Sequence, residues 1–412
     1  MSERRAVVTG IGTVNPIGKN VSEFWKNCLS GTSGVRKITD LINIPPHLSQ
    51  IAGVVSIPFD NKGEKIQKRN LLFAEMAVQE ALQDANLLDT NFNDRCGVFI
   101  ATAIGEIAQM ELSFERNRKT GGHIGFIPLQ SQYYEDSFFF NNIAANIAQK
   151  YSCRGGSVTI ATGCTGGNDA MGYGLHMIRS GNVDMCIVGA VEAPITPLVV
   201  AAFGKIGATS KRNHDPQKAS RPFDKDRDGF VLAEGCGILI LENFDHAQKR
   251  DAKIYAEIRG TASVNNCYHM TDIPQDGISI SKACLLALKD AKIDPEEVDF
   301  INAHGSSTPQ NDTAECNAFY RIFGKRAKEI PVTSIKSQIG HALSAANSIE
   351  LISVVLSIQD SRIPPTLNLE SQDPTCPLTV VSKKSLEKNV TTVLKTSSGF
   401  SGIHSSLVLK KI

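Results

Sequence analysis

The segment Ser157-Val-Thr-Ile-Ala-Thr-Gly-Cys164-Thr-Gly-Gly167 passes from β-branched residues to a turn of small residues, and a helical pattern follows over 168–179. Residues 158–160 are typical of a buried strand. Cys164 would therefore lie at a helix N-terminus, where free backbone N–H groups favour a thiolate and can hold an oxyanion. The segment predicts a thiol nucleophile in an α/β fold.

Strand-like and helix-like runs alternate along the whole chain, which indicates an α/β protein. We expect strands over 6–9, 97–101, 157–161, 185–191, 237–242, 254–264, 298–303, 332–335, 392–394 and 405–410. We expect helices over 70–85, 139–150, 169–180, 279–291, 312–323 and 344–360. Two halves, 1–250 and 251–412, would each carry a catalytic motif, with the insertions 41–67 and 117–137 as caps or a dimer face.

Composition excludes several classes of protein. The 412 residues carry 43 Lys plus Arg against 42 Asp plus Glu, a net charge of +1 that gives no general attraction to nucleic acid or membrane. The ten cysteines form no C-x-x-C pair and no Cys/His cluster with metal-ligand spacing, so we expect reduced thiols and no metal site. The start, Met1-Ser-Glu-Arg-Arg5, has no apolar leader, and no apolar run is long enough to span a membrane. We expect a cytoplasmic protein.

Two downstream segments place histidine beside glycine after a strand-like run. They are Ile301-Asn-Ala-His304-Gly-Ser-Ser-Thr308 and Val332-Thr-Ser-Ile-Lys336-Ser-Gln-Ile-Gly-His341. A lone histidine in such a place is more often a core residue than a functional one. Two histidines at strand ends, together with a cysteine at a strand-to-helix turn, favour one active site assembled by the fold.

These motifs resemble the signatures of β-ketoacyl synthases, the condensing enzymes that extend carbon chains. The resemblance covers almost the whole chain, including Arg221-Pro-Phe-Asp-Lys-Asp-Arg-Asp-Gly-Phe230 and Ser398-Gly-Phe-Ser-Gly402. It implies a thiolase-type fold, in which two similar halves form a five-layered α-β-α-β-α core. It also implies no cofactor on this chain, because the phosphopantetheine arm arrives on an acyl carrier protein.

The resemblance implies a role for each site residue. Cys164 would carry the acyl chain, and neutral His304 and His341 would donate hydrogen bonds to the enolate left when malonyl loses carbon dioxide. The backbone N–H groups of Cys164 and Phe400 would form the oxyanion hole, with the Phe400 ring as a gate. Lys336 would pair with Glu315, and Asp312 would belong to the same supporting network. Ser306 and Thr308 would bind pantetheine. The last two are equally well explained as turn caps.

Finer details are similar to the ketosynthase-alpha subunits of type II polyketide synthases, which work beside a chain-length factor lacking the cysteine. They are Thr162-Gly-Cys-Thr165, Ile195-Thr-Pro-Leu-Val-Val-Ala-Ala202 and Cys267-Tyr-His-Met-Thr271. One departure is Ser401, which replaces a glycine of the gate motif. Basic residues at Lys65, Lys68 and Arg69, and at Lys205, Lys211 and Arg212, are the expected docking groups for an acidic carrier protein.

Other interpretations remain open at this point. A homodimeric fatty-acid ketosynthase or a polyene-forming ketosynthase would share the chemistry. A non-catalytic subunit is disfavoured because Cys164, His304, His341 and Lys336 are all retained. The segment Thr9-Gly-Ile-Gly-Thr-Val-Asn-Pro-Ile-Gly18 is a weak dinucleotide signal, since its third glycine is displaced and Pro16 interrupts the helix start.

Overall fold

The computed structural model describes residues 4–57, 69–119 and 139–412. The first part of the chain contains strands β1 (Ala6–Val14), β4 (Cys96–Ala101), β5 (Ser157–Ile160), β6 (Met185–Glu192) and β7 (Gly235–Asn243). Its helices are α1 (Val21–Ser30), α2 (Arg69–Asp84), α3 (Ile107–Lys119), α5 (Asn142–Lys150), α6 (Gly166–Arg179), α7 (Pro197–Lys205) and α8 (Phe244–Lys249). A small sheet pairs β2 (Val35–Lys37) with β3 (Ile51–Gly53).

The second part contains the main strands β8 (Ala256–Asn265), β9 (Phe300–Asn302), β10 (Pro331–Thr333), β12 (Thr379–Val380), β14 (Thr392–Ser398) and β15 (Ile403–Lys410). Its helices are α9 (Ile278–Ala291), α10 (Pro309–Phe323), α11 (Lys336–Ile339) and α12 (Leu343–Asp360). Strands β11 (Arg362–Ile363) and β13 (Leu386–Glu387) form a separate pair. Each sequence-predicted strand and helix is present, with ends displaced by a few residues.

The strand order repeats between the two parts. In the first, β5, β4 and β6 are parallel neighbours, and β7 and β1 follow as antiparallel strands. In the second, β10, β9 and β14 are parallel, and β15 and β8 follow antiparallel. A short antiparallel pairing of β1 with β8 joins the two into one hydrogen-bonded sheet of 11 described strands. This repeat is the duplication that the thiolase-type fold requires.

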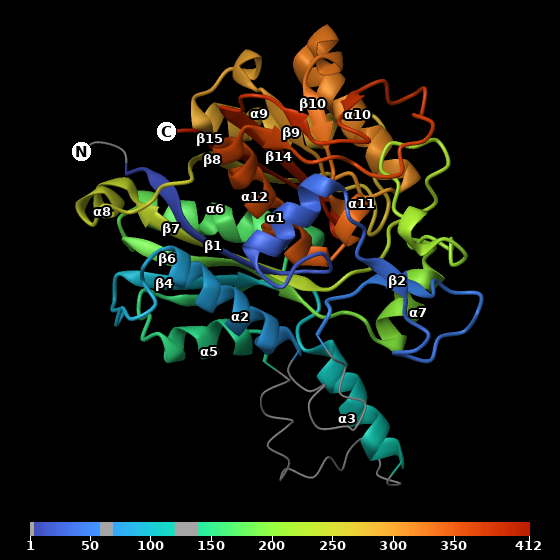
Figure 1. Cartoon of the computed structure of the whole chain (residues 1–412), viewed down its shortest axis with the longest axis horizontal. Helices are drawn as coiled ribbons and strands as arrows, with labels where there is room; N and C mark the ends of the chain where they lie inside the picture. The colour runs from blue at the N-terminus through green and yellow to red at the C-terminus, as the bar shows by residue number, and fades with distance from the viewer. Residues whose placement is uncertain (1–3, 58–68, 120–138) are drawn as a thin grey trace.

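Five layers are visible in Figure 1. Helices α2 and α5 cover the outer face of the first group of strands, and α9 and α10 lie beyond the second group. Helices α6 and α12 lie between the two groups and contact each other. The loops that follow β5 and β9 therefore come together beside the central helices.

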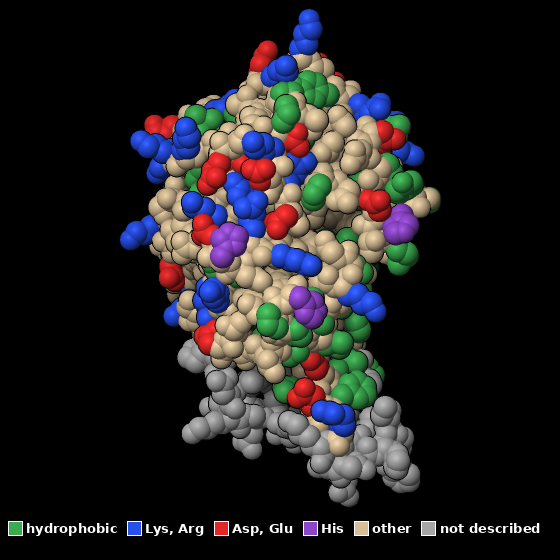
Figure 2. Space-filling view, turned by 90° about the vertical axis from the view of Figure 1, so that its right-hand side faces the viewer, with side chains coloured by type: hydrophobic (Ala, Val, Ile, Leu, Met, Phe, Trp, Pro, Cys, Tyr) green, Lys and Arg blue, Asp and Glu red, His purple; other side chains and the backbone are tan. Residues whose placement is uncertain are grey.

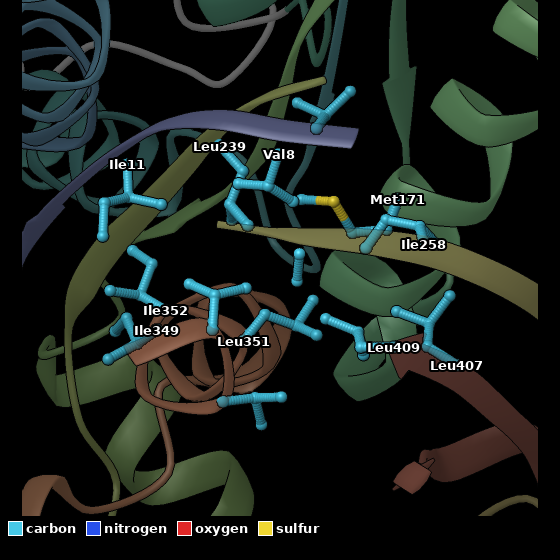
Figure 3. Packing of buried hydrophobic residues seen from close by; sticks show 14 of the residues in the cluster. Val8, Ile11, Met171, Leu239, Ile258, Ile349, Leu351, Ile352, Leu407 and Leu409 are labelled. Carbon is cyan, nitrogen blue, oxygen red and sulfur yellow. The ribbon is translucent and has the colours of Figure 1, made fainter. Parts of the chain in front are cut away.

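Helix α12 has no solvent-facing side over most of its length. All of its residues from Leu343 to Ile358 are buried. Figure 3 shows Ile349 and Ile352 beside Ile11 and Leu239, with Leu407 and Leu409 of β15 farther along the same cluster. The centre of the molecule is thus closely packed around the helix that follows His341.

Two expectations are changed by the fold. Strand β5 is the last strand of the described sheet, and Val158 to Ile160 are partly exposed, so the β-branched run forms an edge strand instead of a buried one. The first two glycines of the weak dinucleotide signal lie inside β1, where a Cβ on Gly10 or Gly12 would come within 2.3 or 2.0 Å of a carbonyl oxygen of α2. These glycines permit helix packing.

No described helix combines the length and apolar character needed to cross a membrane. Of the two predicted insertions, residues 58–67 and 120–137 lie outside the described residues, so the predicted cap or dimer face is described only in part.

Candidate active site

Cys164 lies where the sequence predicts it, at the turn between a strand and a helix. A 3₁₀ turn, Gly163–Thr165, leads from β5 directly into α6. Gly163 has a φ of +62°, which favours glycine. The hydroxyls of Thr162 and Thr165 both donate to Asp169 in the first turn of α6, at 2.5 and 2.7 Å. These bonds hold the nucleophile turn against the helix.

The two predicted histidines come from the second group of strands and meet at the same place. His304 follows β9, His341 precedes α12, and their ring centroids are 5.2 Å apart. Both lie beside a glycine of positive φ, Gly305 at +43° and Gly340 at +78°. A cavity of about 260 Å³ is lined by Cys164, His304, His341, Ser306, Thr308 and Phe400, among others.

The lowered pKa values of the two histidines agree with their expected role as neutral hydrogen-bond donors. Burial, assisted by the positive charge of Lys336, holds the pKa of His304 and of His341 well below 6.5. Neither Nδ1 atom has a hydrogen-bond partner among the described residues. Both rings are therefore uncharged at neutral pH.

The protonation state of Cys164 differs from the thiolate that the sequence predicts. Burial raises its pKa to about 11, with a smaller contribution from nearby Glu192, against the lowering effect of Lys336 and of the backbone N–H groups of Phe400 and Cys164. The resting residue is consequently a thiol and not the thiolate that the helix N-terminus alone predicts, because desolvation outweighs the favourable dipoles. The two amides that act on the sulfur are the two expected to form the oxyanion hole.

The predicted ion pair between Lys336 and Glu315 is wrong. Lys336 Nζ donates to Glu350 Oε1 at 2.6 Å, and Lys395 Nζ donates to Glu350 Oε2 at 2.6 Å. Burial lowers the pKa of Lys395 to about 8, although Glu350 opposes that change. All three charged groups are enclosed in the protein, and one carboxylate serves two ammonium groups.

Glu315 has a different function from the one expected. Its carboxylate accepts the backbone N–H groups of His304 and Gly305, each at 2.7 Å, and the hydroxyl of Thr396 at 2.6 Å. Asn311 Nδ2 donates to it at 3.1 Å. A buried carboxylate is stable here because several donors surround it. Glu315 thereby fixes the turn that carries the histidine.

Asp312 belongs to a neighbouring network. It accepts the backbone N–H of Phe223 at 2.9 Å and lies 3.7 Å from the guanidinium of Arg227. Burial raises its pKa to about 6, against the lowering effect of Arg227. Asp312 therefore fastens the Arg221–Phe230 motif to α10, and in the part of the chain that the structure describes it makes no hydrogen bond to either histidine.

Ser306 and Thr308 lie both in a turn and at the cavity. Their hydroxyl oxygens lie 2.9 Å apart, and both residues line the cavity. Thr308 is also the N-cap of α10, where its hydroxyl accepts the N–H of Asn311 at 3.4 Å. Capping and exposure to the cavity are compatible at these positions.

Phe400 begins a 3₁₀ turn, Phe400–Gly402, in which Ser401 has a φ of +65°. A series of rings runs from it into the site. Phe400 lies 6.2 Å from Phe203, Phe203 lies 5.4 Å from Phe230, and Phe230 lies 5.2 Å from His341, measured between centroids. The serine occupies the left-handed conformation that glycine adopts more easily.

The predicted docking residues that the structure describes differ in exposure. Lys65 and Lys68 lie outside the described residues. Arg69 is only 8% exposed and pairs with Glu234 at 2.6 Å, so its prediction as a surface docking residue is wrong. Lys205 and Lys211 are exposed. On the face that carries α7, basic and acidic side chains are interspersed (Figure 2).

Arg212 is partly buried, and its guanidinium donates to the carbonyl of Asp226 at 2.7 Å. Asp228 lies 3.7 Å from the same group. Lys205 and Lys211 are consequently the freer of the predicted docking cations that the structure describes.

Four buried polar residues around the site escaped the sequence analysis: Ser344, Asn347, Glu350 and Lys395. Glu350 is the single charged residue of the long helical run 343–358, a signal that could have identified it, because an unpaired buried charge is costly. In the parts that the structure describes, no group of three or more His, Cys, Asp or Glu could hold a metal ion.

A duplicated five-layered fold, with one cysteine and two histidines on a shared cavity, defines a thiolase-type condensing enzyme. Family models for the N-terminal and C-terminal domains of β-ketoacyl synthase match residues 3–247 and 255–370. The chain belongs to the β-ketoacyl synthase family, whose members are acyltransferases that form carbon–carbon bonds.

Three similar proteins show which members of that family this chain resembles. The tetracenomycin polyketide synthase ketoacyl synthase alpha subunit of Streptomyces glaucescens is 41% identical, over 100% of this chain and 98% of its own. A solved type II acyl carrier protein–ketosynthase complex, bound to the hexaketide, is 44% identical with a TM-score of 0.93 and full coverage of both chains. The ishigamide ketosynthase/chain length factor is 31% identical with a TM-score of 0.89, over 100% of both chains.

Proposed function

We propose that this chain is the catalytic ketosynthase subunit of a type II polyketide synthase. It condenses malonyl-carrier protein with an acyl chain held on Cys164, losing carbon dioxide. The observation that supports this most strongly is the meeting of Cys164 with two neutral histidines, His304 and His341, on one cavity. The proposed division into halves, 1–250 and 251–412, is supported by the repeated strand order.

In the first half-reaction, the sulfur of Cys164 attacks the thioester carbonyl of the acyl-carrier protein. The proton of the thiol must leave, and a neutral imidazole beside the cavity can accept it. The N–H groups of Cys164 and Phe400, which act on the sulfur at rest, hold the oxyanion of the tetrahedral intermediate. The carbonyl then re-forms, and the carrier sulfur leaves and takes up the proton.

In the second half-reaction, malonyl-carrier protein loses carbon dioxide and becomes an enolate. Neutral His304 and His341 donate hydrogen bonds to the enolate oxygen, and the enolate carbon attacks the acyl group on Cys164. The Cys164 sulfur is released as the new carbon–carbon bond forms. The cationic Lys336 favours this chemistry because its field disfavours protonation of both imidazoles.

The partners follow from the same chemistry. Phosphopantetheine would arrive on the acyl carrier protein and be bound by Ser306 and Thr308, which both line the cavity. A chain-length factor resembling this chain but lacking the cysteine would complete a heterodimer. A relative described as a polyketide synthase alpha subunit, and a solved ketosynthase/chain length factor, support this assembly.

The test uses purified protein with acyl- and malonyl-carrier protein, with and without a chain-length factor, and mass spectrometry of both Cys164 and the carrier-bound product. Acylation of Cys164 with sustained elongation only in the presence of the second subunit is the expected result. Repeated elongation by the chain alone would instead identify a homodimeric fatty-acid type enzyme. No adduct in the native protein, or the same adduct in Cys164→Ala, would overturn the assignment of the nucleophile.

A further inference from the structure

The first turn of α12 contacts the nucleophile turn through side chains. Ser344 Oγ donates to the carbonyl of Gly163 at 2.6 Å. Asn347 Nδ2 donates to the carbonyl of Cys164, which also accepts the hydroxyl of Ser397 at 3.3 Å. The two peptide groups on either side of the Cys164 Cα atom are thus each held by side chains from elsewhere in the fold.

The bond from Ser344 bears directly on the oxyanion hole. The carbonyl of Gly163 and the N–H of Cys164 belong to one planar peptide group, so fixing the oxygen fixes the direction of the N–H. Gly163 has a φ of +62°, and a Cβ at this position would meet nothing within 4 Å. The carbonyl of Gly163 also accepts the backbone N–H of Gly166, so the 3₁₀ turn and the Ser344 hydroxyl together orient this peptide.

We propose that Ser344 is a positioning residue of the acyl-transfer step, which holds the Gly163–Cys164 peptide so that its N–H points at the developing oxyanion. This inference rests on the proposed ketosynthase function and names a residue that acts through the backbone. Donation to the carbonyl also polarises the same peptide and strengthens its N–H as a donor. The Ser344 side chain is fully buried and is not among the residues that line the cavity, so the substrate does not meet it directly.

The surroundings leave the hydroxyl hydrogen of Ser344 available for this bond. Glu192 is the nearby carboxyl group that interacts with Ser344, and burial raises its pKa to about 8, against the lowering effect of the Ala103 N–H and the Ser344 hydroxyl. At neutral pH most of this carboxyl is protonated and competes weakly for the serine hydrogen. A Cβ on Gly166 would lie 2.7 Å from Ser344 Oγ, which shows how closely the serine fits the turn.

The experiment compares two reactions of Cys164 in the full-length protein. Acylation by hexanoyl-N-acetylcysteamine passes through an oxyanion, whereas alkylation by iodoacetamide does not. Both reactions use the thiolate, so their rate ratio at one pH cancels the thiolate fraction. Intact-protein mass spectrometry measures both rates for wild type, Ser344→Ala and Ser344→Cys. The cysteine variant nearly preserves the side-chain volume but replaces the hydroxyl by a weak hydrogen-bond donor. Ser357→Ala is the matched control, because the buried hydroxyl of Ser357 lies on the same helix and donates to the carbonyl of Ser353, away from the nucleophile turn.

Both Ser344 variants should lower the acylation-to-alkylation ratio about 10-fold, less than the 10²–10³ expected for complete loss of an oxyanion donor. Ser357→Ala should leave the ratio unchanged. An unchanged ratio in a folded Ser344 variant would overturn this inference while the proposed function stands. An equal fall in both rates would also overturn it, since it would show a general structural role. Failure of wild-type Cys164 to be acylated would remove the proposed function itself.

Discussion

Lys336 and Glu350 form an ion pair enclosed in the protein, with 2.6 Å between Nζ and Oε1, and neither side chain is more than 1% exposed. The second carboxylate oxygen accepts Lys395 at the same distance. Because one carboxylate balances two ammonium groups, the cluster retains a net positive charge beside the histidines. That charge contributes to the low pKa of both His304 and His341.

Replacing Glu350 by Gln should destabilise the protein strongly. The substitution leaves two buried ammonium groups without a counter-charge, and breaking a buried pair costs about 3–5 kcal/mol. The free energy of unfolding, measured by urea denaturation monitored by circular dichroism, should fall by about this amount. Glu329→Gln on the exposed surface is the control and should change stability by less than about 0.5 kcal/mol. Similar stability for the two variants would contradict the structure of the cluster.

The stability of the protein relative to Lys395→Met should rise between pH 8 and pH 10. Burial lowers the pKa of Lys395 from 10.5 to about 8 in the folded state. Between these values the unfolded chain binds more protons than the native one, so the free energy of unfolding increases with pH. Below pH 8 both states hold the proton, and the difference from Lys395→Met should be constant. Urea titrations at several pH values test this, and a falling difference would exclude the lowered pKa.

Alkylation of Cys164 by iodoacetamide should become about tenfold faster per pH unit from pH 7 to pH 10. The thiol pKa of about 11 leaves the thiolate as a small fraction over this range, and only the thiolate reacts. Peptide mapping by mass spectrometry follows this site separately from the other cysteines, with Cys164→Ala to confirm the assignment. A rate that levels off below pH 9 would show that the helix N-terminus outweighs burial.

Glu315→Gln should impair decarboxylation more than it impairs the nucleophile. The amide cannot accept both backbone N–H groups that the carboxylate now accepts, so the turn carrying His304 loses one of its supports. We expect release of carbon dioxide from malonyl-carrier protein to slow by about tenfold, a loss of roughly 1.4 kcal/mol of transition-state stabilisation. The alkylation rate of Cys164 serves as the internal control. Equal slowing of both reactions would argue for general disruption.

Reversing two exposed charges, Lys205→Glu with Lys211→Glu, should weaken carrier-dependent turnover. Electrostatic steering of an acidic carrier protein depends on surface cations and is screened by salt. We expect about a fivefold rise in KM for acyl-carrier protein at low ionic strength, because charges at the rim of a protein–protein interface mainly affect the rate of association. Turnover of a small N-acetylcysteamine thioester should be unchanged. Lys289→Glu, exposed at the end of α9, is the matched control, and an equal loss with both substrates would exclude docking.

The α/β class was predictable because hydrophobic periodicity changes clearly between strands and helices along this chain, whereas the thiolase-type arrangement was implied by the family resemblance. Helix α12 shows both the success and the limit of that approach. Its apolar run predicts a helix over 344–360, yet nothing in the run indicates that Glu350 would face Lys336 and Lys395, which lie in different elements. Strand β5 was also predicted as a strand, but its place at the edge of the sheet was not. A β-branched run is equally suited to a central strand and to an edge strand.

By itself, the sequence determined the identity of the reacting groups and the local structure that presents each one. Cys164 at a strand-to-helix turn, and His304 and His341 beside glycines, depend on neighbours a few residues away. Only the tertiary structure decided how these groups ionise and what supports them. The raised pKa of Cys164, the pairing of Lys336 with Glu350 and the bond from Ser344 to Gly163 arise from burial and from contacts between distant segments. Desolvation and long-range pairing depend on the assembled fold, and local sequence patterns do not encode them separately.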